Sequence, residues 1–342
     1  MCRLRLQEVV KVKSSIEKYG SLAKHRAFLG KPAKRGSVEP FPCRPGDIFA
    51  KQVRGLVERL EVISCRDIVI GLSGGLDSAL ALLVAFAAYE KLGLDKAGLH
   101  VYTMPGFGTT RRTKGNAEIL CEGLGLKIET ISIVKACRQH FKDIGHDGKT
   151  PDVTFENAQA RMRTLILMDK ANMNNGIVLG TGDLSEIALG WCTYNGDHMA
   201  MFAVNNDVPK TVVRKICAWW AKAHPGKAAD ALVDIIDTPV SPELVKGQVT
   251  ENTIGPYELH DFFLWNFIMN EMGTADLQSA AERYFAGRYG AEEISKTLAT
   301  FMRRFFSQAF KRNCQCDGVK VFPFELSPRG WWIPSELGQV KL

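Results

Sequence analysis

The sequence predicts an α/β protein with a doubly wound parallel sheet, helices on both faces and a helical C-terminal extension. Short apolar runs alternate with helix-length segments between about residues 47 and 180, as in parallel strands joined by crossover helices. From Asp230 onward the pattern is helical. We divide the chain into a basic N-terminal segment or linker, residues 1–46, and one domain, residues 47–342.

The first predicted helix of the domain begins at Asp47, which we expect to cap it. Its apolar face carries Ile48, Val53, Leu56, Val57 and Leu60. Strands are expected at 67–70, 99–104, 127–133 and 177–179. Helices are expected at 7–22, 79–88, 110–124, before Phe141, and at 155–172, 259–272, 275–289 and 291–312.

A glycine-rich loop, Gly71-Leu72-Ser73-Gly74-Gly75-Leu76-Asp77-Ser78, joins the first strand to its helix. Glycines let backbone N–H groups approach a ligand, and a helix N-terminus attracts anions, so we expect phosphate here. The loop lacks the lysine of a Walker loop. An acid beside phosphates needs a cation between them, which makes Asp77 a candidate Mg²⁺ ligand. The alternative is that Asp77 caps the helix.

A second polar loop, Gly180–Glu186, follows the last predicted strand. The doubly wound layout places it beside the first loop. Glu186 is expected to complete the metal site or to grip a ribose or an ammonium ion; the alternative is an ordinary acid at a helix start. Asn157 and Arg161 share a helix face and suit the polar edges and phosphates of a nucleotide, unless that face is simply solvated.

Three features further along the chain are open to two interpretations. Trp191 and Tyr194 could stack on a heterocycle or pack in the core. Lys210 could meet a phosphate or lie at the surface. An apolar stripe in the last helix forms either core or a subunit contact; it comprises Leu298, Phe301, Met302, Phe305, Phe306 and Phe310.

Composition limits the classes of function. The formal charge of +7, from 44 basic and 37 acidic residues, suits a nucleic acid or an anionic small substrate. The basic residues concentrate before position 36 without an aromatic platform, so we expect no nucleic-acid binding. No apolar run approaches the ~20 residues of a membrane span, and no signal peptide is evident. Nine scattered cysteines fit reduced thiols in a cytoplasmic enzyme.

The glycine-rich loop resembles the signature of the N-type ATP pyrophosphatases, which cleave ATP to AMP and pyrophosphate. Further stretches are similar to the synthetase domain of the glutamine-dependent NAD synthetase family: DVTFENAQAR from Asp152, GIVLGTGDLSEIALGW from Gly176, FKRN from Phe310 and LSPRGWW from Leu326. The resemblance implies ATP-dependent amidation of deamido-NAD through an acyl-adenylate. A tRNA-modifying pyrophosphatase is the alternative.

The resemblance also implies site residues. Catalytic roles fall to Asp77, Glu186 and Lys210, and Mg²⁺ to Asp77 and Glu186. ATP would be bound by Gly71, Ser73, Gly74, Gly75, Leu76, Asp77, Ser78, Thr181 and Lys210. Deamido-NAD would be bound by Asn157, Arg161, Glu186, Trp191, Cys192, Thr193, Tyr194 and Lys311, the last of these across a dimer interface.

The nitrogen donor and the partners are expectations too. About 46 residues precede the synthetase region, too few for the N-terminal glutaminase of the glutamine-dependent enzymes. We therefore expect ammonia as the donor, taken from solution or from a separate glutaminase, unless this chain is truncated. The partners are small-molecule substrates and a second copy of the chain, because the phenylalanine-rich helices offer more apolar surface than one small sheet needs.

Overall fold

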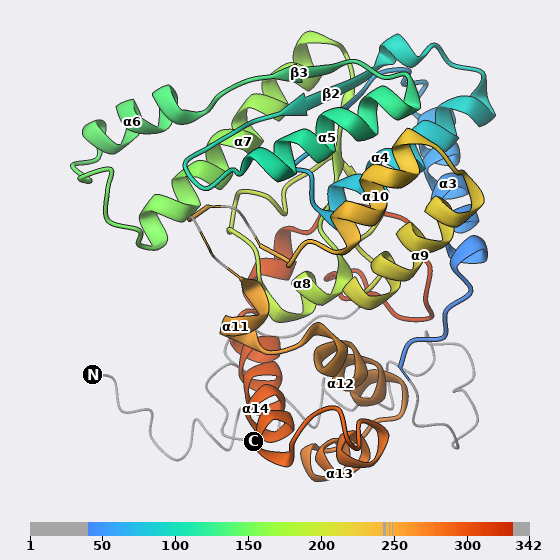
Figure 1. The fold of residues 1–342 in the computed structure, drawn as a ribbon, viewed down its shortest axis with the longest axis vertical. Helices are drawn as coiled ribbons and strands as arrows, with labels where there is room; N and C mark the ends of the chain where they lie inside the picture. Colours follow the sequence, from blue (N-terminus) through green and yellow to red (C-terminus); the bar gives the residue numbers. More distant parts are fainter. Residues whose placement is uncertain (1–39, 242–243, 246, 248, 331–342) are drawn as a thin grey trace.

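The structure, a computed structural model, describes residues 40–330 apart from 242, 243, 246 and 248 (Figure 1). The predicted N-terminal basic segment and its helix at 7–22 therefore lie outside the described residues, except for the last few positions before Asp47. The same holds for the two tryptophans that end the LSPRGWW stretch. No helix in the described part is long and apolar enough to cross a membrane.

A five-stranded parallel sheet forms the centre, with the strand order β3-β2-β1-β4-β5. The strands are β1 Ile68–Gly71, β2 Leu99–Thr103, β3 Ile128–Thr130, β4 Ile177–Gly180 and β5 Phe202–Ala203. This confirms the predicted doubly wound sheet. The order reverses between β1 and β4, so the segments that leave these two strands emerge side by side. The edge strand β3 is shorter than predicted, and the two-residue β5 was not predicted at all.

Helices cover both faces of the sheet (Figure 1). The neighbouring helices α3 Pro45–Val62, α4 Leu76–Leu92, α5 Arg111–Leu124, α9 Lys210–Ala223 and α10 Lys227–Ile236 pack on one face. On the other face lie α6 Val134–Asp143 and α7 Val153–Met173. The alternation of strand residues explains the two layers: Ile68 and Ile70 belong to one apolar cluster, and Val69 to the other.

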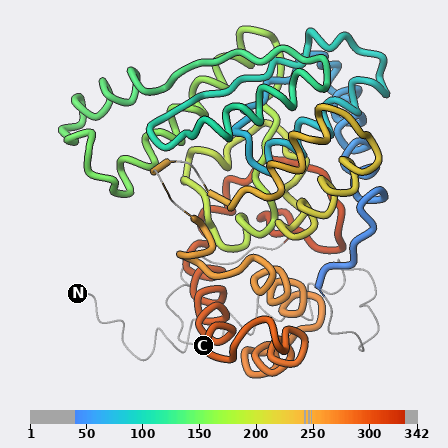
Figure 2. Tube along the Cα trace, in the orientation of Figure 1, coloured from blue at the N-terminus to red at the C-terminus, as the bar shows by residue number. Residues whose placement is uncertain are grey.

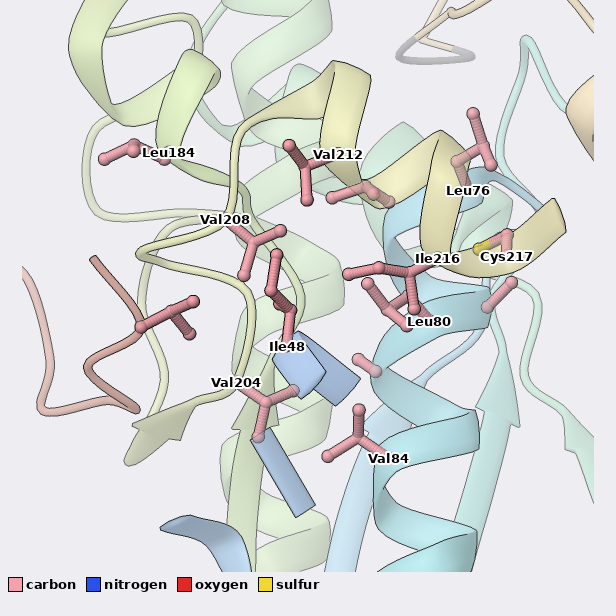
Figure 3. Packing of buried hydrophobic residues seen from close by; sticks show 14 of the residues in the cluster. Ile48, Leu76, Leu80, Val84, Leu184, Val204, Val208, Val212, Ile216 and Cys217 are labelled. Carbon is pink, nitrogen blue, oxygen red and sulfur yellow. The ribbon is translucent and has the colours of Figure 1, made fainter. Parts of the chain in front are cut away.

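The larger cluster fixes the positions of the helices that begin at the site. Figure 3 shows Ile48 of α3 close to Leu80 of α4 and Ile216 of α9. Five predicted apolar positions of α3 are buried. That helix begins at Pro45, however, so the prediction that Asp47 caps it is wrong; a proline at the first helical position loses only an N–H that has no partner there.

The C-terminal helices gather at one end of the molecule (Figures 1 and 2). They are α11 Thr250–Ile254, α12 Tyr257–Met269, α13 Thr274–Tyr284 and α14 Ala291–Ser307, followed by a 3₁₀ segment, Ala309–Cys314. Most of the α14 apolar stripe faces inward: Phe301 and Phe305 are fully buried, whereas Phe310 is 39% exposed. The stripe is therefore mainly core, and it no longer supports the argument for a dimer.

Candidate active site

The glycine-rich loop is held in shape by its own hydroxyls. Ser73 Oγ accepts from the Gly75 N–H at 3.2 Å and lies 3.0 Å from Ser78 Oγ, which donates to the Gly75 carbonyl. Gly74 has φ +85°, and a Cβ there would lie 2.0 Å from the Thr113 carbonyl oxygen. Only glycine fits this close approach. The loop ends at the N-terminus of α4, whose first N–H groups have no partner within the helix.

The second polar loop lies directly beside the first, as predicted. Strands β1 and β4 pair through Ile68↔Ile177 and Val69↔Val178, so their following loops leave the same edge. Asn205 joins them: its Nδ2 donates to the Asp77 carbonyl at 2.9 Å and to the Thr181 carbonyl at 3.1 Å. The short helix α8, Leu184–Leu189, starts there with Asp183 as its cap.

Three carboxylates meet around one ammonium group. Oxygen atoms of Asp77, Asp183 and Glu186 all lie within 4.8 Å of one another. Lys210 Nζ is 2.5 Å from Asp77 Oδ2, 2.9 Å from Asp183 Oδ2 and 2.9 Å from Glu186 Oε1. The Lys210 side chain is only 2% exposed and that of Asp183 is fully buried, whereas those of Asp77 and Glu186 are each 21% exposed, so the ion pair with Asp183 is the one shielded from water. The structure therefore brings Asp77, Glu186 and Lys210 together, with the lysine paired to the acids rather than lying at the surface. Asp77 is not the helix cap, because Gly75 holds that position.

The cluster contains three carboxylates but only one ammonium group, so the carboxylates repel one another. Burial raises the pKa of the Glu186 carboxyl to about 7, and the Asp77 charge adds to that rise although Lys210 opposes it. Burial likewise raises the pKa of Asp183 well above its usual range. For Lys210, burial alone would lower the pKa, but the three carboxylates together raise it. A further positive charge at this point would relieve the repulsion between the acids.

The donor set of this cluster fits Mg²⁺. All three side chains offer hard oxygen ligands, which Mg²⁺ prefers. Asp77 Oδ1 is buried and has no hydrogen-bond partner among the described residues. A buried carboxylate oxygen without a partner is costly unless something else satisfies it. The residues present are therefore compatible with a divalent cation.

A cavity of about 510 Å³ opens above the two loops, within the usual size range of small-molecule sites. Most of the predicted site residues line it: Gly71, Ser73, Gly74, Gly75, Leu76, Asp77, Ser78, Asn157, Thr181, Glu186, Trp191, Cys192, Thr193, Lys210 and Lys311. Arg161 and Tyr194 do not. Arg161 is exposed and donates to the Tyr194 carbonyl at 3.3 Å, while the Tyr194 ring lies beside those of His198 and Phe310.

Another part of the cavity lining combines an aromatic ring with cations. Asn157 Oδ1 accepts from the Thr193 hydroxyl at 2.7 Å, which ties α7 to the segment after α8. Lys311 Nζ donates to the carbonyls of Gly190 and Cys192. The Arg304 guanidinium lies 4.9 Å from the centre of the Trp191 ring, a cation–π contact that fixes the indole at the cavity surface.

Several residues of the site were not predicted from the sequence. Asp183 of the acid cluster stands in the quoted Gly180–Glu186 loop, and an acid three residues before Glu186 is a recognisable cap signal. Asp197 and Arg304, which line the cavity, were not predicted either. No pattern in the sequence around Arg304 predicts its role. The apolar stripe predicts only the helix that carries it, and its contact with Trp191 spans more than a hundred residues.

Taken together, the parallel sheet and the two loops define an adenine nucleotide α-hydrolase-like protein. Within that class, residues 48–288 match the NAD synthase family, and the chain belongs to that family. Two curated relatives are glutamine-dependent NAD(+) synthetases. The protein of Mycobacterium leprae is 37% identical over 342 residues, covering 88% of this chain and 50% of the relative. That of Thermotoga maritima is 34% identical, covering 83% and 46%. The chain thus spans about half the length of these relatives.

Solved structures agree on the fold. A glutamine-dependent NAD(+) synthetase from Cytophaga hutchinsonii superposes with a TM-score of 0.69 at 18% identity, covering 85% of this chain and 54% of that one. An NMN synthetase from Francisella tularensis gives a TM-score of 0.56 at 27% identity, covering 73% of this chain and 98% of that one.

Proposed function

We propose that the chain catalyses ATP-dependent amidation of deamido-NAD to NAD, releasing AMP and pyrophosphate. The observation that carries this proposal is the meeting of Asp77, Asp183, Glu186 and Lys210 where two phosphate-type loops emerge side by side. Membership of the NAD synthase family supplies the reaction that suits such a site.

In the proposed reaction, an oxygen of the nicotinate carboxylate attacks the α-phosphorus of ATP, and pyrophosphate leaves. Ammonia then attacks the acyl carbon, loses a proton, and AMP departs with the former carboxylate oxygen. Positioning and charge neutralisation are the main tasks of the protein, because adenylation itself provides the leaving group.

The phosphates are assigned to the glycine-rich loop and the start of α4, where free N–H groups and the positive end of the helix dipole favour anions. Thr181 and Lys210 would contact ATP from the second loop and from α9. Asp77 and Glu186, with Asp183, would hold Mg²⁺, which supplies positive charge to offset the charge that develops on pyrophosphate.

The deamido-NAD side is assigned to the other wall of the cavity. Trp191, fixed by Arg304, offers a flat apolar surface for a ring, and Asn157, Cys192, Thr193 and Lys311 surround it. Arg161 and Tyr194 remain candidates only for parts of the substrate that extend beyond the cavity, because neither lines it.

Ammonia is the nucleophile that the reaction needs, and we propose that this chain uses it directly. A cytoplasmic location and a homodimer remain part of the proposal. Support for a dimer comes from α7, which exposes apolar side chains that do not line the cavity: Leu165 is 55% exposed and Met173 74%. Helix α7 also lies on the face of the sheet that carries the smaller apolar cluster and fewer helices.

The decisive experiment is an assay of the chain with ATP, Mg²⁺ and deamido-NAD, supplied with ammonium or with glutamine. We expect equimolar NAD, AMP and pyrophosphate with ammonium and no NAD with glutamine alone. Equal rates with the two donors would contradict direct use of ammonia. Absence of NAD and AMP with either donor would refute the proposed function.

The similarity to an NMN synthetase favours one competing substrate. Nicotinic acid mononucleotide carries the same carboxylate but lacks the second nucleotide, so it belongs in the same assay at matched concentrations. A higher kcat/KM for the mononucleotide would reassign the substrate while leaving the chemistry unchanged. Turnover that requires RNA would instead support a tRNA-modifying enzyme.

A further inference from the structure

Helix α12 of the C-terminal bundle reaches the two loops of the site through one face. Tyr257 and Asp261 lie four residues apart, so they share that face. Both are buried, and Asp261 is fully so. Lys210 Nζ lies 5.3 Å from the centre of the Tyr257 ring, which therefore closes one side of the acid cluster. The C-terminal helices are thus in contact with the machinery that the sheet carries.

The Asp261 carboxylate binds both elements that present the charged residues. Its Oδ1 accepts a short hydrogen bond from the Ser185 hydroxyl on α8. Its Oδ2 accepts from the Thr211 N–H at 2.9 Å and from the Thr211 hydroxyl at 2.7 Å, both on α9. The network closes on itself, because Ser185 Oγ also accepts from the Lys210 N–H at 2.8 Å.

This carboxylate replaces a cap that α9 lacks. The residue before α9 is Pro209, whose side chain cannot accept a hydrogen bond, and no side chain caps this end locally. Asp261 accepts a hydrogen bond from the Thr211 N–H, which has no acceptor within the helix, and places negative charge at the positive end of the helix dipole. Lys210 and Glu186 are the immediate chain neighbours of Thr211 and Ser185. One buried group therefore fixes the backbone from which both charged side chains extend.

We propose that Asp261 is a positioning residue, which holds Lys210 and Glu186 in the positions from which they bind ATP and Mg²⁺. It is not among the residues that line the cavity, so it acts through Ser185 and Thr211. The inference rests on the proposed function for the identity of the ligand. Independently of the ligand's identity, we infer that nucleotide binding depends on α12, a helix far from both loops in the sequence.

The central variant is Asp261→Asn, which keeps the shape of the side chain but turns an N–H₂ group toward hydrogen-bond donors. We expect affinity for ATP with Mg²⁺, measured by titration calorimetry, to fall about 10- to 100-fold, the usual cost of losing a group that orients functional ligands. In the NAD assay, KM for ATP should rise and kcat should fall, while KM for deamido-NAD stays within about twofold.

A structural control comes from the same helix. His260 is also buried, and its Nε2 contacts the Ile254 carbonyl at 2.9 Å rather than α8 or α9. His260→Leu should lower the melting temperature without changing ATP affinity per folded molecule. Thr211→Val removes one hydroxyl donor to Asp261 and should weaken ATP binding, and Thr211→Ser, which retains the hydroxyl, should restore most of that loss.

The outcomes separate this inference from the proposed function. Calorimetry with ATP and Mg²⁺ needs no turnover, so Asp261→Asn can be scored even if the wild-type chain makes no NAD. Wild-type ATP affinity in Asp261→Asn, with a melting temperature lowered as in His260→Leu, would overturn the positioning role. A wild-type protein that binds ATP but forms no NAD would overturn the proposed function alone.

Discussion

Replacing Lys210 by methionine tests the physical core of the site. Methionine has nearly the same length and volume, so the packing around the stem is kept while the ammonium group is lost. The buried Asp183 carboxylate and the partly buried carboxylates of Asp77 and Glu186 would then face one another with no cation among them, where Lys210 Nζ now lies 2.5–2.9 Å from each. Asp183, which is fully buried, would then carry a negative charge without a cation beside it.

The expected loss of stability is large. Removing one partner of a buried ion pair typically costs about 3–5 kcal/mol, because the other charge stays buried without compensation. For a domain of this size, such a loss lowers the melting temperature by roughly 6–10 °C. Because the remaining acids are the proposed Mg²⁺ ligands, Mg²⁺ should restore stability to Lys210→Met more than it stabilises the wild type.

The assay is thermal and urea unfolding in the presence of a chelator, repeated with added Mg²⁺. The control is Lys215→Met, which changes an exposed lysine on the same helix and should shift stability by less than about 0.5 kcal/mol. Adding Glu186→Gln to Lys210→Met should recover part of the loss, since one of the opposed charges is removed. A chelator-treated Lys210→Met protein within about 1 kcal/mol of the wild type would refute the electrostatic reasoning.

Three further predictions concern the loop, its metal ligand and a buried acid. Asp77→Asn should abolish pyrophosphate release with the circular dichroism spectrum unchanged; full activity would remove Asp77 from the metal site. Gly74→Ala should cost more stability than Gly93→Ala, because both glycines have positive φ but only Gly74 meets a backbone oxygen, at 2.0 Å; equal melting temperatures would contradict this. Burial raises the pKa of Asp207 to about 7, so the folded state keeps a proton that the unfolded chain loses above about pH 4, and stability falls as pH rises toward 7. Asp207→Asn, which cannot lose that proton, should gain stability relative to the wild type between pH 5 and pH 8; a constant difference in melting temperature would rule this out.

Regular patterns in the sequence predicted the elements of the sheet layer. Alternation and spacing located the four longer strands and α5, whose cap, Thr110, accepts from the Thr113 N–H. The same reasoning missed α9, because Lys210–Ala223 follows a proline and begins without a capping side chain of its own. Its N-terminus is satisfied by Asp261, and no local pattern in the residues around Lys210 could reveal that partner.

By itself, the sequence determined the class of site. The order of glycines, hydroxyls and acids in Gly71–Ser78 and Gly180–Glu186 dictates a loop at a helix start that favours phosphate, because those backbone conformations and N–H groups depend on neighbouring residues alone. The tertiary structure decided which charges share the site. Lys210 meets Asp77 across 133 positions, and Asp261 meets Ser185 across 76. Such contacts depend on how helices pack over the sheet, and a buried charge acquires its partner only when that packing excludes water.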